Sequence, residues 1–281
     1  MTVQSQVWRC RDRGLLLDRT FIMGILNVTP DSFSDGGQFS DPTQAIARGL
    51  KMVDEGADIL DVGGESTRPG AAAVDEAAEL RRVLPVVGAL VARTHCLISV
   101  DTSKAGVARA ALVAGAHIIN DVSAATWDVA MPEVVVEFQA GLVLMHCQGR
   151  PQTMQHAPHY ADVVAEVRDF LTERLDVLTA AGLPSENMVI DPGIGFGKML
   201  EHNLELLRHL ARLVALGRPV LIGVSRKSML GKLTGRDQSE QRLAAGLAAQ
   251  TVAVLRGARI IRTHDVAAAR DAARVADACL I

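Results

Sequence analysis

Eight short apolar runs recur along the chain from Phe21 onward, and each is followed by a polar loop and then by an Ala- and Leu-rich stretch of helical periodicity. Runs that are apolar on both faces and alternate with helices predict parallel strands that those helices cover. Eight such units in a row, with no second domain between them, predict closure into a (β/α)8 barrel. The runs span 21–28, 58–64, 97–102, 118–123, 141–146, 188–193, 220–225 and 259–264.

A doubly wound open sheet is the main alternative, but it requires edge strands and a crevice with a glycine fingerprint, and neither is evident. Near copies of a Gly-Ala break precede four of the runs, as EGAD, AGAH, QAGL and RGAR. A helix that ends in glycine before a strand is the usual junction of an α/β fold. We therefore expect a single-domain α/β (TIM) barrel over residues 21–281, with residues 1–20 forming a short N-terminal hairpin cap.

The composition excludes several classes of function. A net charge of −3 argues against a nucleic-acid surface, which is normally basic. The 4 cysteines form no CxxC pair, as is typical of idle thiols in a reducing compartment. No secretory leader is evident, and no run approaches the roughly 18 uncharged apolar residues of a membrane helix. We expect a soluble, cytoplasmic protein that binds neither nucleic acid nor membrane.

Polar or charged residues stand at the carboxyl end of almost every predicted strand. Parallel strands bring these ends to one rim of the barrel, where buried polar groups without partners would be costly, so we expect the rim to be functional. Asp61, Asp121 and His146 are more typical of satisfied hydrogen-bonding roles. The full set is Asn27, Asp61, Glu65, Asp101, Asn120, Asp121, His146, Asp191, Ser225, Arg226, Lys227, Arg262 and His264.

The glycine-rich stretch MVIDPGIGFGK, residues 188–198, is similar to a phosphate-binding loop but does not fit one. A P-loop requires glycine where Pro192 stands and Ser or Thr where Met199 stands. The dinucleotide fingerprint GxGxxG is absent as well, because the glycines alternate. What remains is a carboxylate, Asp191, at the end of a strand that is otherwise built for burial.

Three loops carry further polar groups. Residues 24–37, GILNVTPDSFSDGG, combine a sharp turn with a flexible end, which favours a lid. Residues 63–70, GGESTRPG, hold an arginine in a manner that suits an anion. The loops after the seventh and eighth strands often bind phosphate in such barrels, and here they supply cations. Lys227 has an alternative role as a Schiff-base lysine, although such lysines usually lie within a strand.

Anionic and cationic groups on one rim would suit a ligand with a phosphate at one end and a ring bearing N–H donors at the other. The motifs resemble those of the dihydropteroate synthases, bacterial pterin-binding enzymes of the folate pathway. The resemblance runs from about Phe21 to the end of the chain and includes NVTPDSFSDGG, DVGGESTRPG, SVDTSK, INDVS, LMHCQGRPQTMQ, IDPGIGFGK, GVSRKS and RTHDV. It implies condensation of 7,8-dihydropterin-6-ylmethyl diphosphate with 4-aminobenzoate, giving dihydropteroate and diphosphate.

The resemblance also implies a role for individual residues. Catalytic roles fall on Asp35, Arg68, Lys227, Arg262 and His264, and for Asp35 we hypothesise stabilisation of a cationic methylene or orientation of the amine. Asn27 would help to hold Mg²⁺. The pterin site would comprise Asp101, Asn120, Met145, Asp191, Gly223 and Lys227; the aminobenzoate site Phe33, Thr67, Arg68, Pro69, Phe196 and Ser228; and the diphosphate site Asn27, Arg262 and His264. A helix start near Ser228 would favour the carboxylate of aminobenzoate.

Two other functions share the pterin slot. A corrinoid-linked methyltransferase would not need the SRKS and TRP loops or a diphosphate site. A pterin-binding paralogue without catalysis should have lost loop residues that this chain retains. The predicted helix at 241–256 is apolar nearly all round, which permits the homodimer that the family implies. Departures from the family pattern are small: Thr263 stands where valine is common, and Cys147 where methionine is common.

Overall fold

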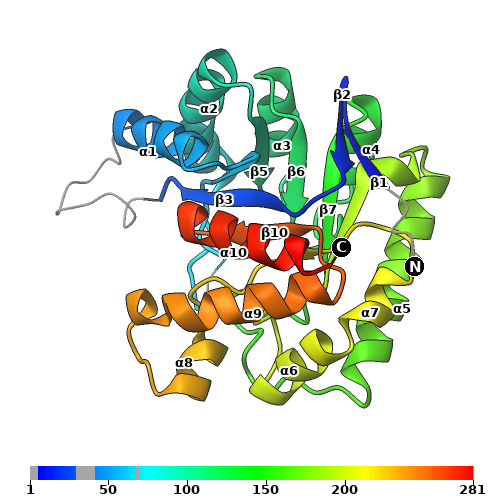
Figure 1. Ribbon diagram of the computed structural model, residues 1–281. Coiled ribbons are helices and arrows are strands. Elements are labelled where there is room, and N and C mark those ends of the chain that lie inside the picture. The colour runs from blue at the N-terminus through cyan, green and yellow to red at the C-terminus, as the bar shows by residue number, and fades with distance from the viewer. Residues whose placement is uncertain (1–5, 30–41, 68–69, 281) are drawn as a thin grey trace.

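A computed structural model describes residues 6–29, 42–67 and 70–280, and these form one barrel with an added hairpin (Figure 1). All eight predicted strands are present, each shorter than its apolar run. Their sheet order is β8-β7-β6-β5-β4-β3-β10-β9, with every neighbouring pair parallel. The strands are β3 (Phe21–Asn27), β4 (Ile59–Gly63), β5 (Leu97–Asp101), β6 (Ile118–Asp121), β7 (Gly141–Met145), β8 (Met188–Asp191), β9 (Leu221–Ile222) and β10 (Ile260–Thr263).

The barrel closes between β8 and β9 through a single parallel bridge, Ile190 to Val220, supported by the hydrogen bond from Ile190 N to the carbonyl oxygen of Pro219 at 3.0 Å. β9 is the shortest strand, and this closure is correspondingly sparse. The α/β (TIM) barrel is therefore confirmed, with its seam beside the shortest strand.

The predicted N-terminal hairpin is also confirmed. Strands β1 (Gln6–Cys10) and β2 (Arg13–Leu17) pair in antiparallel fashion and lie against the amino end of the barrel (Figure 1). Trp8 is fully buried there, and its indole N–H donates to the carbonyl oxygen of Asn187 at 2.9 Å. Gly141 is required opposite Cys10, because a Cβ at this position would clash with the cysteine sulfur. Whether residues 1–20 and 21–281 are separate units stays a prediction.

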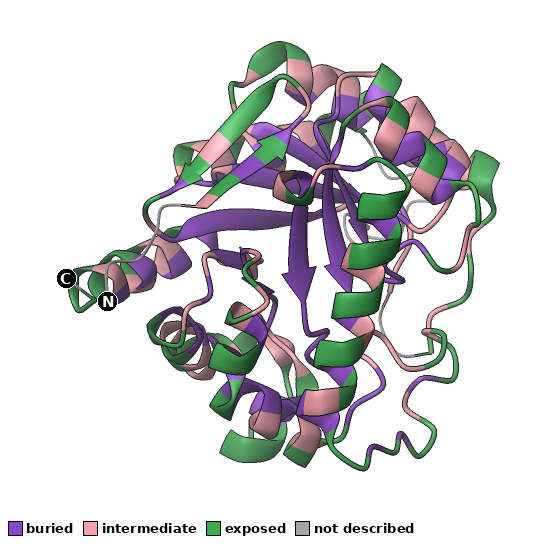
Figure 2. Ribbon diagram, turned by 90° about the vertical axis from the view of Figure 1, so that its right-hand side faces the viewer, coloured by how far each residue is buried: buried purple, intermediate pink, exposed green. Residues whose placement is uncertain are grey.

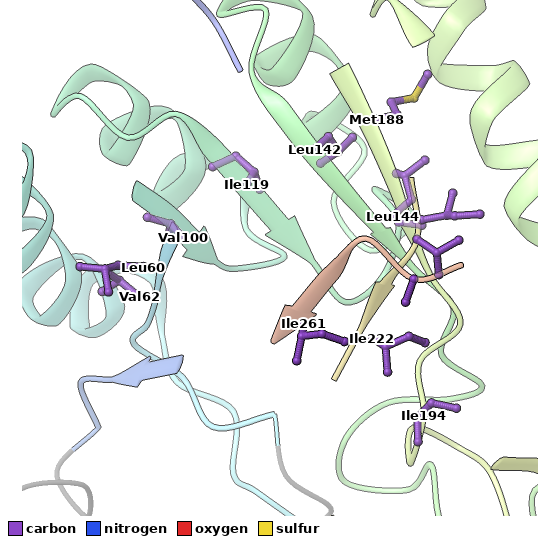
Figure 3. Packing of buried hydrophobic residues seen from close by; sticks show 14 of the residues in the cluster. Leu60, Val62, Val100, Ile119, Leu142, Leu144, Met188, Ile194, Ile222 and Ile261 are labelled. Carbon is purple, nitrogen blue, oxygen red and sulfur yellow. The ribbon is translucent and has the colours of Figure 1, made fainter. Parts of the chain in front are cut away.

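Alternation along each strand divides the side chains into two apolar groups. The outward-facing group packs under the helices and includes Leu60, Val62, Val100, Ile119, Leu142 and Leu144 (Figure 3). The inward-facing group fills the amino end of the barrel and touches the hairpin. Every barrel strand contributes to it: Phe21, Met23, Ile59, Leu97, Ile118, Val143, Val189, Leu221 and Ile260. The amino end is thus packed solid, as expected for a barrel of this size.

Helices cover the outside of the barrel, with exposed residues on their outer sides and buried residues toward the strands (Figure 2). Glycines 56, 115 and 257 adopt positive φ at the predicted junctions, whereas at QAGL the left-handed residue is Gln139, with φ of 48°. The helices are α1 (Pro42–Asp54), α2 (Glu76–Arg93), α3 (Ala105–Val113), α4 (Met131–Glu137), α5 (Val163–Ala180), α6 (Leu200–Arg208), α7 (Leu210–Val214), α8 (Ser228–Thr234), α9 (Leu243–Leu255) and α10 (Val266–Ala278).

One predicted helix is shorter than expected. We expected a helix over 241–256, but a 3-10 helix occupies Ser239–Arg242 and α9 begins only at Leu243. The turn before α9 is fixed by Arg242, whose guanidinium donates to the backbone carbonyls of Arg226 and Arg236 at 2.9 and 3.0 Å. Across the described ranges, no helix is long and apolar enough to cross a membrane.

Candidate active site at the carboxyl rim

Asp61 is the centre of a buried polar network at the carboxyl end of the barrel. Its carboxylate accepts hydrogen bonds from Ser99 Oγ at 2.7 Å, Asn120 Nδ2 at 2.9 Å and Arg262 Nε at 2.6 Å. These groups come from β4, β5, β6 and β10, and Asp61 is fully buried. The satisfied role expected for Asp61 is confirmed, and the network fixes the direction of Asn120 and Arg262.

Asp101 completes the ion pair but keeps one oxygen free. Its Oδ2 accepts from Arg262 NH2 at 2.8 Å, whereas Oδ1 is buried and has no hydrogen-bond partner. Burial raises the pKa of Asp101 from 3.8 to about 7; Arg262 opposes this shift and the charge of Asp61 adds to it. An orphaned carboxylate oxygen at the base of a site is an acceptor that a ligand N–H can satisfy.

Asp191 and Lys227 face the same interior from β8 and from the loop after β9. Asp191 Oδ1 accepts from Gly193 N at 2.7 Å, and burial raises the pKa of this carboxyl while Lys227 lowers it. Burial lowers the pKa of Lys227 to about 8, with Asp191 opposing the shift. Lys227 Nζ donates to the carbonyl oxygen of Ile194 and lies 4.5 Å from the ring centroid of Phe196.

Ser225 and His264 join the ends of β9 and β10. Ser225 Oγ lies 3.1 Å from His264 Nδ1 and accepts from His264 N at 3.2 Å. Arg226 instead forms an ion pair with Asp265 at 2.6 Å, so its charge is used to hold the two loops together. Of the cations expected in these loops, Arg226 is therefore structural.

A cavity of about 460 Å³ opens beside Asp101, between the loops that follow β4, β5, β6 and β7. Thr67 is among its lining residues. Lys104 bridges two carboxylates there, donating to Glu65 and, at 2.5 Å, to Glu79. Glu65 in turn accepts from Val74 N at 3.1 Å, which joins the two ends of the loop that carries Thr67.

The structure brings together most of the predicted pterin residues. Asn27, Gly63, Asp101 and Asn120 are register neighbours across β3, β4, β5 and β6, and Met145 pairs with Asp191. Gly223 directly follows β9, and a Cβ there would lie 3.7 Å from Arg262 Cβ. Ser228 is exposed and begins α8, as predicted. Four predicted residues lie outside the described ranges: Phe33, Asp35, Arg68 and Pro69.

One arrangement differs from the expectation of separate subsites. Arg262, assigned to the diphosphate, bonds directly to Asp101, which is assigned to the pterin ring. Asp121 and His146 were also expected to have their hydrogen-bonding groups paired, and both do. Asp121 accepts from Ser123 Oγ at 2.7 Å, and His146 contacts Lys198. The sequence reasoning missed Lys198 and Lys104, both of which end motifs that it had singled out.

Asn27 is the described residue that could help to hold a metal. Its side-chain oxygen lies 3.6 Å from where a Cβ would stand on Gly63, so the glycine leaves room beside it. Within residues 6–29, 42–67 and 70–280, no group of three or more His, Cys, Asp or Glu side chains could bind a metal ion. One neutral protein oxygen fits Mg²⁺, which commonly keeps several waters and binds substrate phosphates.

A sequence model of the family described as "Pterin binding enzyme" matches residues 23–264. The chain is also 48% identical over 264 residues to the dihydropteroate synthase of Escherichia coli strain K12, covering 94% of this chain and 93% of that protein. This chain belongs to the dihydropteroate synthase family. The family membership expected from the sequence motifs is thereby confirmed.

Solved structures of dihydropteroate synthases support the same conclusion. The Xanthomonas albilineans enzyme with 4-aminobenzoic acid superimposes with a TM-score of 0.93, at 51% identity over 99% of both chains. The enzyme from the same organism in complex with 7,8-dihydropteroate gives 0.88, at 48% identity over 98% of both chains. A pterin-binding dihydropteroate synthase fold thus covers nearly the whole of this chain.

Proposed function

We propose that this protein is a dihydropteroate synthase that condenses 7,8-dihydropterin-6-ylmethyl diphosphate with 4-aminobenzoate in folate biosynthesis. The observation that carries the proposal, beside family membership, is the orphaned Oδ1 of Asp101. This acceptor stands between Asn120 and Arg262 at the base of the rim, where a ring with N–H donors would satisfy it.

The pterin ring would occupy the barrel mouth above the Asp61 network. Asp101 and Asp191 are acceptors for its N–H edge, Asn120 adds an amide, and Lys227 can donate to a ring oxygen. Met145 and Gly223 complete the slot, the first with an apolar side chain and the second by having none beside Arg262. Because Asp61 fixes Asn120 and Arg262 beforehand, little ordering would be needed when the ring binds.

The diphosphate would lie beside Asn27, Arg262 and His264. Asn27 and the diphosphate oxygens would hold Mg²⁺, which when bound would add positive charge to the leaving group. Arg262 donates through Nε to Asp61 and through NH2 to Asp101, so an anion would take over part of an existing ion-pair network. Its guanidinium would remain charged throughout.

The reaction needs a good leaving group more than a strong base. The C–O bond between the methylene carbon and the diphosphate breaks, and the diphosphate keeps the electron pair while Arg262 and His264 spread its charge. The amine nitrogen of aminobenzoate then forms the new C–N bond and loses its proton to water. Asp35 remains our candidate for stabilising the cationic methylene, and Arg68 and Lys227 for assisting the two substrates.

Aminobenzoate would bind above the pterin, among loops rather than strands. Phe196 lies against Lys227, and Thr67 lines the neighbouring cavity, while Ser228 begins α8. Phe33, Arg68 and Pro69 are assigned to the same pocket by resemblance. The protein would therefore recognise its first substrate with strand residues and its second with loop residues.

We also propose a homodimer that uses α8, α9 and α10. These helices expose large apolar side chains although each also packs on its neighbours: Leu233, Leu243, Val252, Leu255 and Val275 are 41–64% exposed. Such a row on adjacent helices suits a partner of the same kind. Sedimentation showing only monomers at micromolar concentration would exclude the dimer. The cytoplasmic location stays a prediction.

The decisive experiment is a coupled assay for diphosphate release from the pterin diphosphate, with and without 4-aminobenzoate and magnesium. We expect release that depends on aminobenzoate and stops on chelation. Release without an aminobenzoate requirement, or none at all, would reject the synthase. Transfer of a methyl group from a methylated tetrahydropterin to a corrinoid would instead support the methyltransferase alternative.

A further inference from the structure

The glycine-rich loop after β8, residues 192–198, is held in place by side-chain hydrogen bonds to its backbone carbonyl oxygens. Four successive carbonyl oxygens each accept from a side-chain donor in the described part of the chain. Gln155 donates to Gly195 at 2.6 Å, and Tyr160 donates to Gly197 at 2.8 Å. The other two donors are lysines: Lys227 to Ile194 and Lys198 to Phe196, the latter at 3.0 Å. A loop held residue by residue in this way has a fixed conformation.

The alternating glycines explain how the loop comes so close to its neighbours. Gly193, Gly195 and Gly197 have φ of 68°, 83° and 61°, a region that favours glycine. A Cβ on Gly193 would clash with the carbonyl oxygen of His146, and one on Gly197 with that of Gln148. The glycines therefore serve close packing against the segment after β7, rather than a phosphate.

Lys198 is the least expected member of this arrangement, because it is only 3% exposed and belongs to none of the ion pairs between described residues. Its Nζ contacts His146 Nδ1 at 2.9 Å, His146 O at 3.3 Å and Phe196 O at 3.0 Å. Burial lowers the pKa of Lys198 to about 7. When protonated, its ammonium group has three N–H donors, and these three acceptors would use all of them. Burial lowers the pKa of His146 to about 3, so the imidazole is neutral and Nδ1 can accept.

A buried lysine without a carboxylate partner is costly, and here only its hydrogen bonds to His146 and Phe196 offset that cost. Here they join the end of β7 to the backbone of Phe196. The Phe196 ring in turn lies against Lys227, 4.5 Å from Nζ, where the proposed pterin and aminobenzoate sites meet.

We propose that Lys198 is a positioning residue that fixes Phe196 for the second substrate. The inference rests on the proposed function, since it assigns Phe196 to aminobenzoate. Lys198 touches neither substrate in this scheme. It acts through the Phe196 carbonyl and through His146. Its loss would leave the pterin residues Asp101 and Asn120 in place, because the Asp61 network holds them separately. Asp191 and Lys227 keep their own bonds to Gly193 and Ile194.

The test compares Lys198→Met with Tyr160→Phe. Both remove one donor to the same loop, but the control acts on Gly197 rather than Phe196. We expect Lys198→Met to raise KM for aminobenzoate about 10-fold while KM for the pterin diphosphate changes less than about twofold, and Tyr160→Phe to change both KM values less than about twofold. Unchanged KM values in both variants, or equal increases for both substrates in Lys198→Met, would overturn the proposal.

A second measurement does not depend on activity. Hydrogen–deuterium exchange of the peptide over 192–199 should speed up in Lys198→Met, while the peptide over 97–103 keeps the wild-type rate. Unchanged exchange in 192–199 would refute a positioning role even if KM moved. If the wild-type protein lacks synthase activity, the proposed function fails by itself, and the exchange result still decides whether Lys198 holds the loop.

Discussion

The two ends of the barrel interior use the same strands for opposite purposes. At the amino end the inward side chains form an apolar floor beneath the hairpin. Two residues further along the same strands, the next inward side chain is polar. Ile59 is followed by Asp61, Ile118 by Asn120, and Ile260 by Arg262. The floor contributes packing and no functional groups. The rim carries the charged side chains, which the packed floor beneath them supports.

Removal of the central carboxylate should have the largest effect. Asp61→Ala would leave Arg262 with a single partner and Asn120 and Ser99 with one fewer, and breaking such a buried pair costs about 3–5 kcal/mol of unfolding free energy. We expect diphosphate release to be lost as well. Urea unfolding and the coupled assay would measure both effects, with Asp61→Asn as the control that keeps an acceptor for Ser99. Wild-type turnover in Asp61→Ala would show that the network does not organise the rim.

Damage to the floor should lower stability alone. Trp8→Ala removes a fully buried indole, so we expect a loss of about 3–5 kcal/mol in unfolding free energy, with KM for both substrates unchanged in the folded protein. Trp8→Phe keeps an aromatic ring but loses the hydrogen bond to Asn187, so we expect the unfolding free energy to fall by about 1 kcal/mol. A change in KM after Trp8→Ala would mean that the two ends are coupled.

The raised pKa of Asp101 gives the rim a pH dependence that the floor lacks. Because the folded-state pKa of about 7 exceeds the ordinary 3.8, its contribution to stability is full below pH 4 and is lost as pH rises to about 7. Ionisation should at the same time strengthen binding of N–H donors, so pterin affinity should increase between pH 6 and 8.

Asp101→Asn should flatten both profiles. Calorimetric titration with a pterin and thermal unfolding across the same pH range would show it. Asp121, whose pKa burial raises to about 6, contributes to the wild-type stability profile, so the informative quantity is the difference between wild type and variant. Lys227, whose pKa burial lowers to about 8, titrates in both proteins, so an identical pH profile of pterin affinity in wild type and Asp101→Asn would show that Asp101 is not the acceptor.

The smallest effect on stability is expected from a change at Ile118, a floor residue two positions before Asn120. Ile118→Val deletes one methylene from the floor and should cost about 0.5–1.5 kcal/mol, with kcat and both KM values unchanged. Denaturant unfolding and steady-state kinetics would suffice. An altered KM would show that Ile118, in the floor, also affects substrate binding.

Local sequence signals were sufficient for the architecture, because eight apolar runs and their glycine junctions each report a strand or a helix end. They also located the rim, since parallel strands must present their last residues together. They did not reveal Lys198, because its burial depends on His146, which lies 52 residues earlier and meets it only in the closed barrel. The late start of α9 was missed for a similar reason: Arg242 bonds to the carbonyl of Arg226, 16 residues away.

The same limit applies to Arg262. The sequence indicated a cation for phosphate, and the resemblance agreed, but neither showed that Asp61 and Asp101 would already bind it. Side chains that reach across the barrel join strands distant in the chain, and no local pattern records such pairs. The roles of individual residues in substrate binding stay predictions.

The solid floor leaves the barrel with one mouth. Both substrates must enter, and both products must leave, through the opening at the carboxyl rim. The strand residues Asn120 and Asp191 lie deeper than the loop residues Thr67 and Ser228, so a molecule seated among the loops would stand in the path of one bound below. The kinetics should therefore be ordered, with pterin diphosphate entering first and excess aminobenzoate slowing its arrival.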